Sequence, residues 1–511
     1  MAEAIPSLPL SDLVEQGLAR AVVGDDQVRI SGVRHDSRAV EPGDLFVAIQ
    51  GQVFDGRDYS QDAVGRGAAA VAAEAELDLA VPVLLVDNAL SSLWKLSRYV
   101  YDDPTAHLPV VGVTGTNGKS TVACMVEQLL LGLGQAPALL GTIENRGPGG
   151  VLPATHTTPM ADDLMRLARW ALETGASHLV FEVSSHALAM ERTDGVHFRI
   201  AAFTNLTQDH LDYHGDMASY GAAKGRLFRE LSPSVAVINV DDPFGRELAS
   251  ELRAAGRACT RCSRTGDHEA ELRVLSHRAD RSGLQARVET PEGQVELKSS
   301  LLGLHNLDNL LLALGCGLAL DHSAGDVAEA LSHASGAPGR LERIEHPEDV
   351  LVFVDYAHTP DALARVCRAV RDATDGGRLL LVFGCGGDRD RGKRPMMGRA
   401  AAEHADVLVV TSDNPRSEDP EAIIDDILPG LVEAGGPLLS AGALSGAPSG
   451  HIAVPDREQA ITLAVGAARP GDAVLIAGKG HESYQLIGDE RLPFDDRQQA
   501  RSAIAALGKG A

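Results

Sequence analysis

Apolar positions follow two different patterns along the chain. Before about residue 105, a short helical pattern with Leu10, Leu13 and Leu18 precedes strand-like segments at 44–49 and 81–88. From residue 110 onward, short runs of consecutive apolar residues alternate with segments in which apolar residues recur every three or four positions. This alternation is typical of parallel sheets that helices cover on both faces. The pattern predicts an α/β fold.

The predicted strands end in polar or glycine-rich residues. The predicted strands, with their polar endings included, are 110–113, 178–183, 199–205, 349–361, 378–390, 406–416 and 472–482. Ligands of open α/β sheets lie beyond the carboxyl ends of the strands, so we expect the chemistry there. The polar interval at about 256–300 predicts an excursion or a small subsheet, and 305–320 predicts a return to helix.

The length of 511 residues exceeds what one hydrophobic core supports and predicts three domains. The charged, proline-containing segment 101–109 indicates a first linker, and Gly336–Arg340 indicates a second hinge. We therefore expect domains at 1–105, 106–338 and 339–511.

Composition indicates a cytoplasmic protein that does not span a membrane. Apolar residues make up 44% of the chain, no run approaches the length of a membrane span, and the N-terminus lacks the basic and apolar segments of a secretory signal. Six scattered cysteines are too few for a disulfide framework, which agrees with a reducing compartment. The pair Cys259 and Cys262 has no second pair or histidine at zinc spacing, so we attribute it to chance or packing.

The formal net charge of −25 disfavours nucleic acid as a partner. Because the overall field repels anions, any phosphate must be held locally by helix starts, a few lysines or arginines, and divalent cations.

The segment LPVVGVTGTNGKST, residues 108–121, combines a strand, a glycine-bearing loop, Lys119, Ser120 and a helix. In this context loop N–H groups face phosphates, the lysine reaches the β and γ oxygens, and the serine can ligate Mg²⁺. Val113 stands where the strict motif has its first glycine. The alternative is a structural strand-to-helix turn, which would not need the lysine and the hydroxyl. We expect nucleotide binding.

Three further residues are candidates for metal and acid chemistry. Glu182 ends a predicted strand, where a carboxylate could bind Mg²⁺ that bridges the phosphates. His210 follows another strand, but Mg²⁺ prefers oxygen ligands, so taken singly it fits a capping or hydrogen-bonding histidine better. Lys224, taken singly, fits an ordinary solvated lysine.

Seven segments together resemble the Mur ligases, which build the peptide stem of peptidoglycan. They are GVTGTNGKST, EVSSHAL, TNLTQDHLDYHG, GLHNLDN, DYAHTPD, DNPR and GKGHE, and the resemblance runs from about residue 36 to 497. The phosphate loop of that family has the same glycine spacing. The resemblance implies a uridine-nucleotide-binding N-terminal domain, a central P-loop-type ATPase domain with a mostly parallel sheet, and a Rossmann-like C-terminal domain for the incoming amino acid.

The resemblance also implies the site residues. Those for ATP are Gly115, Thr116, Asn117, Gly118, Lys119, Ser120, Thr121, Asn306, Asn309, Arg340 and Asp355. Those for a UDP-N-acetylmuramoyl dipeptide are Ser37, Gln52, Val53, Phe54, Thr157, Thr158, Ser184, Ser185 and Arg192, with Met190 where some relatives have a glutamine. Those for diaminopimelate are Arg389, Asp413, Asn414, Pro415, Arg416, Gly478 and Glu482. Catalytic or metal-binding roles fall to Lys119, Ser120, Glu182, His210 and Lys224, the last as a carbamate formed from CO₂ that helps to hold a second Mg²⁺.

The implied reaction is ATP-driven amide formation in cell-wall synthesis, which serves cell shape and cell division. The γ-carboxylate of D-glutamate forms an acyl phosphate, and the amine of meso-2,6-diaminopimelate then attacks it. Arg416 offers a planar fork that matches the distal carboxylate of diaminopimelate and repels the bare ammonium of lysine. Taken singly, Arg416 would fit a surface arginine in a turn that Asn-Pro begins. We expect a monomer that acts on small molecules.

Two other readings stay open. A related ligase, either lysine-adding or of the folylpolyglutamate type, would share the central domain, but DNPR and the uridine-side segments argue against it. A nucleotide-switched regulatory protein would keep the phosphate loop and have no use for the three C-terminal motifs.

Overall fold

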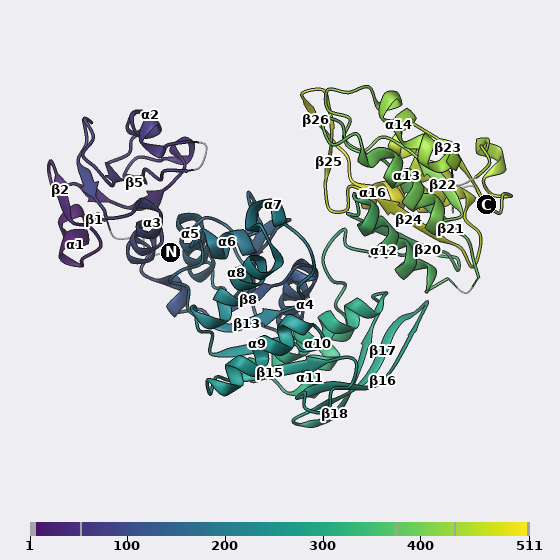
Figure 1. The fold of residues 1–511 in the computed structure, drawn as a ribbon, viewed down its shortest axis with the longest axis horizontal. Helices are drawn as coiled ribbons and strands as arrows, with labels where there is room; N and C mark the ends of the chain where they lie inside the picture. Colours follow the sequence, from purple (N-terminus) through teal and green to yellow (C-terminus); the bar gives the residue numbers. More distant parts are fainter. Residues whose placement is uncertain (1–6, 52–53, 375, 434–435, 508–511) are drawn as a thin grey trace. The chain divides into compact units, whose positions relative to one another are not determined.

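The computed structural model describes residues 7–51, 54–374, 376–433 and 436–507 (Figure 1). Within them, strands form sheets of five, eleven and six members together with two short antiparallel pairs, β1 (Leu8–Pro9) with β3 (Arg29–Ile30) and β25 (Tyr484–Ile487) with β26 (Glu490–Pro493). Neighbouring strands of the three large sheets are mostly parallel. The predicted α/β class is confirmed.

The five-stranded sheet is parallel except at one edge, where β2 runs antiparallel to β7. Its order is β2 (Ala21–Val23), β7 (Val83–Leu85), β6 (Ala70–Ala73), β5 (Asp44–Val47), β4 (Gly32–Arg34). The same segment contains α1 (Leu10–Glu15), α2 (Ser60–Gly65), α3 (Ala89–Val100), η1 (Ser37–Ala39), η2 (Gly56–Tyr59) and, within the predicted linker, η3 (Pro104–Ala106). Helix α1 ends at Glu15, so the first helix is shorter than the apolar pattern up to Leu18 predicts.

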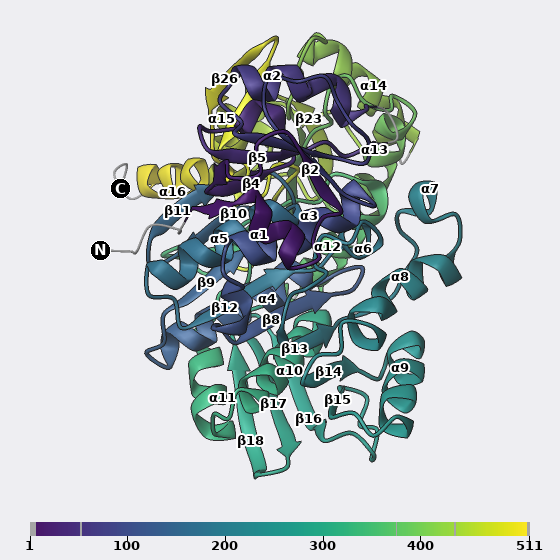
Figure 2. The ribbon, with the colours of Figure 1, turned by 90° about the vertical axis from the view of Figure 1, so that its left-hand side faces the viewer.

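The eleven-stranded sheet carries the phosphate loop. Its order is β11 (Gly150–Pro153), β10 (Glu144–Gly147), β9 (Pro137–Leu140), β12 (His178–Glu182), β8 (Val110–Thr114), β13 (Phe198–Phe203), β14 (Val235–Asn239), β15 (Cys259–Ser263), β16 (Leu272–Asp280), β17 (Gly283–Thr290), β18 (Gly293–Ser299). The polar interval at 256–300 therefore extends the large sheet and does not form a separate subsheet. Strands β8 and β13 run side by side (Figure 2).

Eight helices connect or cover the strands of this region among the described residues. They are α4 (Lys119–Gly132), α5 (Ala161–Glu173), α6 (Ser185–Ala189), α7 (Leu211–His214), α8 (Met217–Arg229), α9 (Pro243–Ala254), α10 (Leu304–Ala319) and α11 (Ala324–Ser332). No described helix combines the length and the apolar character needed to cross a membrane.

The six-stranded sheet has the order β19 (Glu342–Ile344), β20 (Leu351–Asp355), β24 (Ala473–Ala477), β21 (Leu379–Phe383), β22 (Val407–Val410), β23 (Gly450–Ala453). Only β19 is antiparallel to its neighbour. Its helices are α12 (Pro360–Arg371), α13 (Lys393–His404), α14 (Pro420–Glu433), α15 (Arg457–Ala467), α16 (Asp496–Leu507) and the short η4 (Ala441–Ala443). Alternate residues face two cores: Leu379 and Leu381 belong to one, and Leu380 and Val382 to the other. This explains the unbroken apolar runs.

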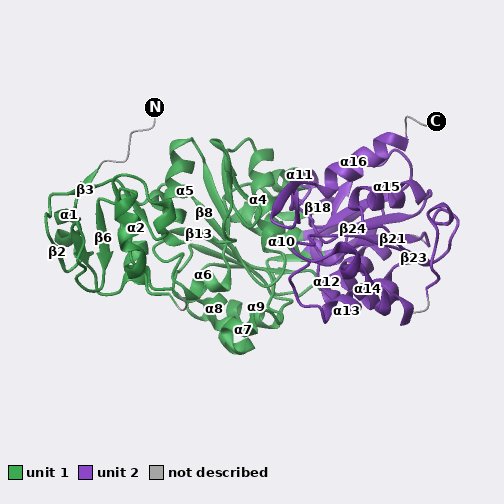
Figure 3. Cartoon of the chain, turned by 90° about the horizontal axis from the view of Figure 1, so that it is seen from above, with its two compact units in different colours: residues 1–274, 289–295, 308–331 green, residues 275–288, 296–307, 332–511 purple. Residues whose placement is uncertain are grey.

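The chain forms two compact units (Figure 3). One contains residues 1–274, 289–295 and 308–331, and the other contains residues 275–288, 296–307 and 332–511. The five-stranded sheet and the phosphate loop belong to the first unit, and the six-stranded sheet belongs to the second. The division into three domains at 1–105, 106–338 and 339–511 stays a prediction.

Candidate active site

The phosphate loop joins the end of β8 to the start of α4, and two of its glycines are required by the backbone. Gly115 has φ +146° and Gly118 has φ +87°, conformations that favour glycine. A Cβ on Gly115 would lie 1.8 Å from the Thr204 hydroxyl, and one on Gly118 would lie 2.6 Å from Asn309 Oδ1. The loop therefore packs against the segment after β13 and against the predicted ATP residue Asn309.

Strand pairing places the loop between two other strand ends. In the register, Glu182 of β12 pairs with Val113 of β8, and Phe203 of β13 pairs with Thr114. The residues that follow β13 then hold the loop. The Thr204 hydroxyl donates to Asn117 O at 2.6 Å, and the Asn117 N–H donates to Asn205 Oδ1 at 3.0 Å.

The beginning of α4 offers a site for an anion. The first N–H groups of a helix have no intrahelical acceptor, and the helix dipole favours negative charge there. Lys119, Ser120 and Thr121 form this first turn. Since the preceding loop is fixed from both sides, these groups are arranged before any phosphate binds.

Two lysines converge on one carbonyl of the loop. Lys119 Nζ donates to Gly115 O at 3.1 Å and to Thr116 O at 2.9 Å, and Lys224 Nζ, from α8, donates to Gly115 O at 2.7 Å. Lys224 is 1% exposed and lies 4.5 Å from the centre of the Tyr220 ring. Burial, and secondarily the charge of Lys119, lowers the pKa of Lys224 to about 6. Its amine is therefore mostly neutral near pH 7. Lys224 is not the solvated lysine that its sequence position alone indicated.

Glu182 lies at the centre of a hydrogen-bond network at the end of β12. Its Oε2 accepts from the Ser120 hydroxyl at 2.8 Å, and its Oε1 accepts from the N–H and the hydroxyl of Thr142 at 3.0 and 3.1 Å. Ser120 and Glu182, both predicted metal ligands, thus lie next to each other and present the oxygen atoms that Mg²⁺ prefers. Thr142 was not predicted, because a threonine outside the quoted motifs gave no signal in the sequence.

His210 makes its contacts with other aromatic side chains. It is exposed, has φ +52°, and its ring packs against those of His186 at 4.8 Å and Tyr220 at 6.4 Å between centres. Within the described residues, no hydrogen bond or ion pair joins His210 to Ser120, Glu182 or Lys224. Its role at a metal stays a prediction.

The residues predicted for the dipeptide surround the backbone of Glu182. The Thr158 hydroxyl donates to Glu182 O at 2.8 Å and accepts from the Ser184 N–H at 3.0 Å. Arg192 donates to Thr158 O at 3.1 Å, and its buried Nε has no acceptor among the described residues. Burial lowers the pKa of Arg192. A half-buried guanidinium with an unused donor at Nε suits an anionic ligand.

Thr157 joins the same network, since its hydroxyl oxygen lies 3.1 Å from that of Thr142. Ser185 follows Ser184 in the chain, and its hydroxyl lies 3.0 Å from His214 Nε2. Met190 Sδ lies 3.3 Å from Arg192 Nη2. The structure therefore brings together five of the nine residues predicted for the dipeptide.

Of the residues predicted on the uridine side, the structure describes Ser37 and Phe54. Ser37 is buried in η1, whose first turn Asp36 caps, and Phe54 is 67% exposed. Gln52 and Val53 lie outside the described residues.

One group among the described residues has the spacing of metal ligands: His35, Asp162 and Asp163, whose ligand atoms lie within 4.8 Å of one another. The His35 ring and its backbone N–H bind the Asp162 carboxylate at 2.8 and 3.0 Å. Asp163 accepts from Arg166 at 2.7 Å. These contacts explain the group without a metal ion, and they tie the segment beside Ser37 to the start of α5.

The residues predicted to bind diaminopimelate lie after three neighbouring strands, β24, β21 and β22. Asn414 Nδ2 donates to Glu482 Oε2 at 2.9 Å, and the Asp413 carboxylate lies 3.6 Å from where a Cβ on Gly478 would be. Asp413 is buried, and its Oδ1 has no hydrogen-bond partner among the described residues. Its nearest cationic group is the buried ammonium of Lys479, 3.8 Å from Oδ1, which leaves this oxygen able to accept a hydrogen bond from a ligand.

Arg416 is half-buried and donates to Gly387 O at 2.7 Å. Its backbone is left-handed, with φ +53°, which is costly for a residue with a side chain. Arg389 is exposed and donates to Asp388 O at 3.2 Å. A Cβ on Gly386 would lie 3.0 Å from Arg416 Nη1 and 3.7 Å from Arg389 Cγ, so both arginines border Gly386.

The remaining residues predicted for ATP, Asn306, Arg340 and Asp355, belong to the second unit. Asp355 is buried and accepts from the N–H groups of Leu341 at 2.6 Å and Ala357 at 2.7 Å, while burial raises its pKa. The Arg340 guanidinium lies 4.8 Å from the centre of the Tyr356 ring. Their contact with a nucleotide stays a prediction.

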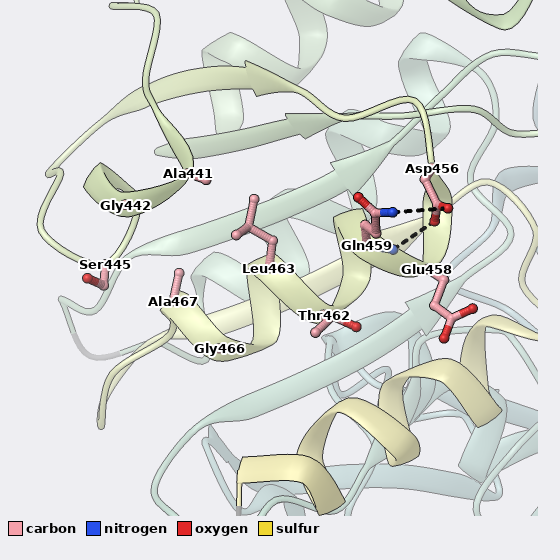
Figure 4. Close-up of a pocket in the computed structure, with 10 residues that line it drawn as sticks. All are labelled: Ala441, Gly442, Ser445, Asp456, Glu458, Gln459, Thr462, Leu463, Gly466 and Ala467. Carbon is pink, nitrogen blue, oxygen red and sulfur yellow. Dashed lines mark hydrogen bonds between the residues drawn. The ribbon is translucent and has the colours of Figure 1, made fainter. Parts of the chain in front are cut away.

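A cavity of about 750 Å³ lies elsewhere in the second unit, between η4 and α15 (Figure 4). It is lined by Ala441, Gly442, Ser445, Asp456, Glu458, Gln459, Thr462, Leu463, Gly466 and Ala467. The dashed bonds in Figure 4 show Asp456 capping the helix through Gln459. None of the predicted site residues lines this cavity, so volume alone does not locate the site.

Three family models match the chain: "Mur ligase family, catalytic domain" at 29–101, "Mur ligase middle domain" at 113–317 and "Mur ligase, glutamate ligase domain" at 339–480. The chain is 43% identical over 509 residues to UDP-N-acetylmuramoyl-L-alanyl-D-glutamate--2,6-diaminopimelate ligase from Gloeobacter violaceus, with 98% of this chain and 99% of the relative covered. It is 44% identical over 497 residues to the protein of that name from Geobacter metallireducens, covering 95% and 96%.

Solved structures agree with these matches. A structure of a ligase with the same name has a TM-score of 0.70 at 33% identity, with 98% of this chain and all of that chain covered. The structure of MurF ligase from Thermotoga maritima in complex with ADP has a TM-score of 0.58 at 19% identity, covering 94% and 98%, and shows likeness of fold alone.

Replacing Lys224 by methionine should stabilise the first unit, and more so near pH 7 than near pH 9.5. Between the folded pKa of about 6 and the ordinary value of 10.5, the unfolded lysine binds a proton that the folded lysine does not. The stability of the original chain therefore rises with pH in this window, by up to about 1.4 kcal/mol per pH unit, and the variant lacks this dependence. Urea unfolding in CO₂-free buffer, followed by the fluorescence of Trp94 and Trp170 in that unit, measures it.

The matched control is the exposed Lys95, whose change to methionine should have the same effect on stability at both pH values. If Lys224→Met raises the free energy of unfolding equally at both pH values, the amine of Lys224 is not neutral in the folded protein.

Proposed function

The chain belongs to the Mur ligase family, and we propose that it joins meso-2,6-diaminopimelate to the D-glutamate of UDP-N-acetylmuramoyl-L-alanyl-D-glutamate at the expense of ATP. The near-complete coverage of relatives named for this reaction supports the proposal. The observation that carries it is the position of Glu182. Its side chain binds Ser120 of the phosphate loop, and its backbone binds Thr158, predicted for the dipeptide. One residue thus connects the two places that must meet for phosphoryl transfer to a carboxylate.

In the proposed reaction, an oxygen of the D-glutamate γ-carboxylate attacks the γ-phosphorus of ATP, which gives an acyl phosphate and ADP. The amine of diaminopimelate then attacks the acyl carbon, inorganic phosphate leaves, and the amine gives up a proton. The first step requires positioning and neutralisation of charge more than a protein nucleophile.

The chain has residues for each of these tasks. Lys119 and the N–H groups of the first turn of α4 bind the β and γ phosphates. Ser120 and Glu182 are the side chains placed to hold Mg²⁺, since their oxygens are already adjacent. Bound Mg²⁺ supplies charge neutralisation for the phosphate oxygens. Arg192, with its unused buried donor, binds an anionic group of the dipeptide substrate.

Lys224 fits the proposed carbamate. Its Nζ is buried and mostly neutral near pH 7, and a neutral amine is the form that adds to CO₂, with loss of a proton. The product is an anionic oxygen ligand where a protonated lysine would repel a cation. We propose that this carbamate and His210 attend a second Mg²⁺.

The residues that follow β21, β22 and β24 select diaminopimelate in this proposal. Arg416 pairs with the distal carboxylate, Asn414 adds a hydrogen bond, and Glu482 with Asp413 supplies acceptors for an ammonium. Arg389, Pro415 and Gly478 complete the set. The arginine fork excludes lysine because lysine would leave it unpaired.

The remaining assignments complete the proposal. Asn306, Asn309, Arg340 and Asp355 contact ATP, and Ser37, Phe54 and the neighbouring Gln52 and Val53 contact the uridine nucleotide. We propose three domains at 1–105, 106–338 and 339–511, and a monomer in the cytoplasm, since one chain carries every predicted residue.

A phosphate-release assay tests the function. Release should require ATP, the UDP-sugar dipeptide and the amino acid together, and kcat/KM should be at least about 30-fold lower with L-lysine than with meso-diaminopimelate, as expected for the loss of about 2 kcal/mol from an unpaired charge. Release without an amino acid would favour the nucleotide-switched protein, and a preference for lysine would exclude the proposed substrate.

Arg416→Ala should raise the KM for diaminopimelate about tenfold or more and leave the KM for ATP nearly unchanged, because the fork contacts only the amino acid. The control is Arg399→Ala, which removes an exposed arginine of α13 that pairs with Glu433. Equal effects of Arg416→Ala on both constants would remove this assignment.

Lys224→Ala should lose most of the activity, and acetate or another short carboxylate should restore part of it by supplying the missing oxygen ligand. The measurement is the rate of product formation at increasing acetate, with chloride at equal ionic strength as the control. Full activity of the unsupplemented variant would show that no carbamate is needed.

A further inference from the structure

Lys479 is a buried cation to which the proposed reaction assigns no role. It follows β24 between Gly478 and Gly480, which have φ +123° and +54°. Its exposed fraction is 0%, so its side chain cannot reach a bound substrate. A buried ammonium is costly unless polar groups surround it, and the identity of those groups indicates what it does.

The Lys479 ammonium joins two loops of the amino-acid cluster. Its Nζ donates to Asn414 Oδ1 at 3.0 Å and to Glu482 Oε2 at 3.1 Å. Asp413 Oδ1 lies 3.8 Å away. Two carboxylates and one amide therefore share a single buried positive charge, and all three belong to residues proposed to bind the incoming amino acid.

These contacts determine which way the Asn414 amide faces. Its Oδ1 accepts from Lys479 and from the Leu486 N–H at 3.0 Å, so the Nδ2 group must face Glu482, to which it donates at 2.9 Å. The second N–H of Asn414 remains for another acceptor. A carboxylate of the substrate is such an acceptor.

The same ammonium determines what Glu482 offers. Both hydrogen bonds to its carboxylate end on Oε2, and Oε1 accepts none within the described residues. With Lys479 in place, the buried Asp413 and the half-buried Glu482 have one cation between them. Glu482 Oε1 can then accept from the ammonium of the amino acid.

We propose that Lys479 is a positioning residue for amino-acid recognition: it orients Asn414 as a donor and keeps Glu482 as an acceptor, without contacting the substrate. The inference rests on the proposed function, because it concerns the amino-acid site of that reaction.

A second buried cation keeps the two loops in place independently of Lys479. Arg457 donates to Ala477 O at 3.0 Å and to Ser412 O at 3.3 Å, and it pairs with Asp496 at 2.7 Å with both side chains fully buried. Ala477 and Ser412 directly precede the loops that Lys479 joins. Loss of Lys479 should therefore change the polarity of the cluster while the backbone stays in place.

The kinetic test uses the full chain with Lys479→Met, which keeps an unbranched side chain shorter by the terminal nitrogen and removes the charge. We expect the KM for diaminopimelate to rise about tenfold or more, with the KM values for ATP and the UDP-sugar dipeptide nearly unchanged. The matched control is Arg378→Met, which breaks the Arg378 and Asp472 pair at the amino ends of β21 and β24. It should lower stability and leave all three KM values unchanged.

An unchanged KM for diaminopimelate in folded Lys479→Met, or an equal rise of all three constants, would overturn the inference. If the methionine variant does not fold, Lys479→Gln, which keeps a donor and removes the charge, takes its place in every measurement.

A second readout does not depend on ligase activity. In protein labelled with ¹⁵N-asparagine, the side-chain amide signal of Asn414, assigned through Asn414→Asp, should move in Lys479→Met and not in Arg378→Met. If the original chain forms no amide with diaminopimelate, the proposed function fails, and this spectrum still tests the contact. An Asn414 signal that does not move would overturn the inference.

Discussion

Parallel pairing of β8 with β12 and β13 is the constraint on which the first unit depends. Because the three strands end at the same edge, Glu182, the phosphate loop and Thr204 follow one another across that edge. Hydrogen bonds from Thr204 and Asn205 then hold the loop, and Glu182 connects Ser120 to the Thr142 and Thr158 segments. The neighbouring ends of β21, β22 and β24 do the same for the amino-acid cluster in the second unit.

Local charge in these clusters opposes the charge of the whole chain. The protein carries a net charge of −25, yet the charge of Lys119 lies at a carbonyl of the phosphate loop, to which the mostly neutral amine of Lys224 also donates. In the second unit, buried Lys479 and Arg457 each bind carboxylates within the cluster or directly behind it. Positive charge is therefore placed at close range within these clusters, and local binding of phosphate stays a prediction.

The strands that position the site could be predicted from sequence, because their apolar runs are long and end in recognisable polar residues. Lys119, Ser120 and Glu182 were found for this reason, and the structure brings the three together. Thr142 could not be found, since it acts through a hydrogen bond to a residue 40 positions away. Lys479 stood within a recognised motif, but only its complete burial distinguishes it from a solvated lysine. The two compact units are defined by contacts between segments that are distant in sequence, and the periodicity of apolar residues does not predict such contacts.

At the left-handed position 416, the backbone favours glycine, whereas the proposed selection of the amino acid requires an arginine. Glycine adopts this conformation without steric cost, so it would relieve the strain, and it would also remove the guanidinium. A laboratory selection for thermal resistance alone would then favour chains that no longer discriminate between zwitterions. Under the proposed assignment, the ligand and not the fold requires an arginine at this position.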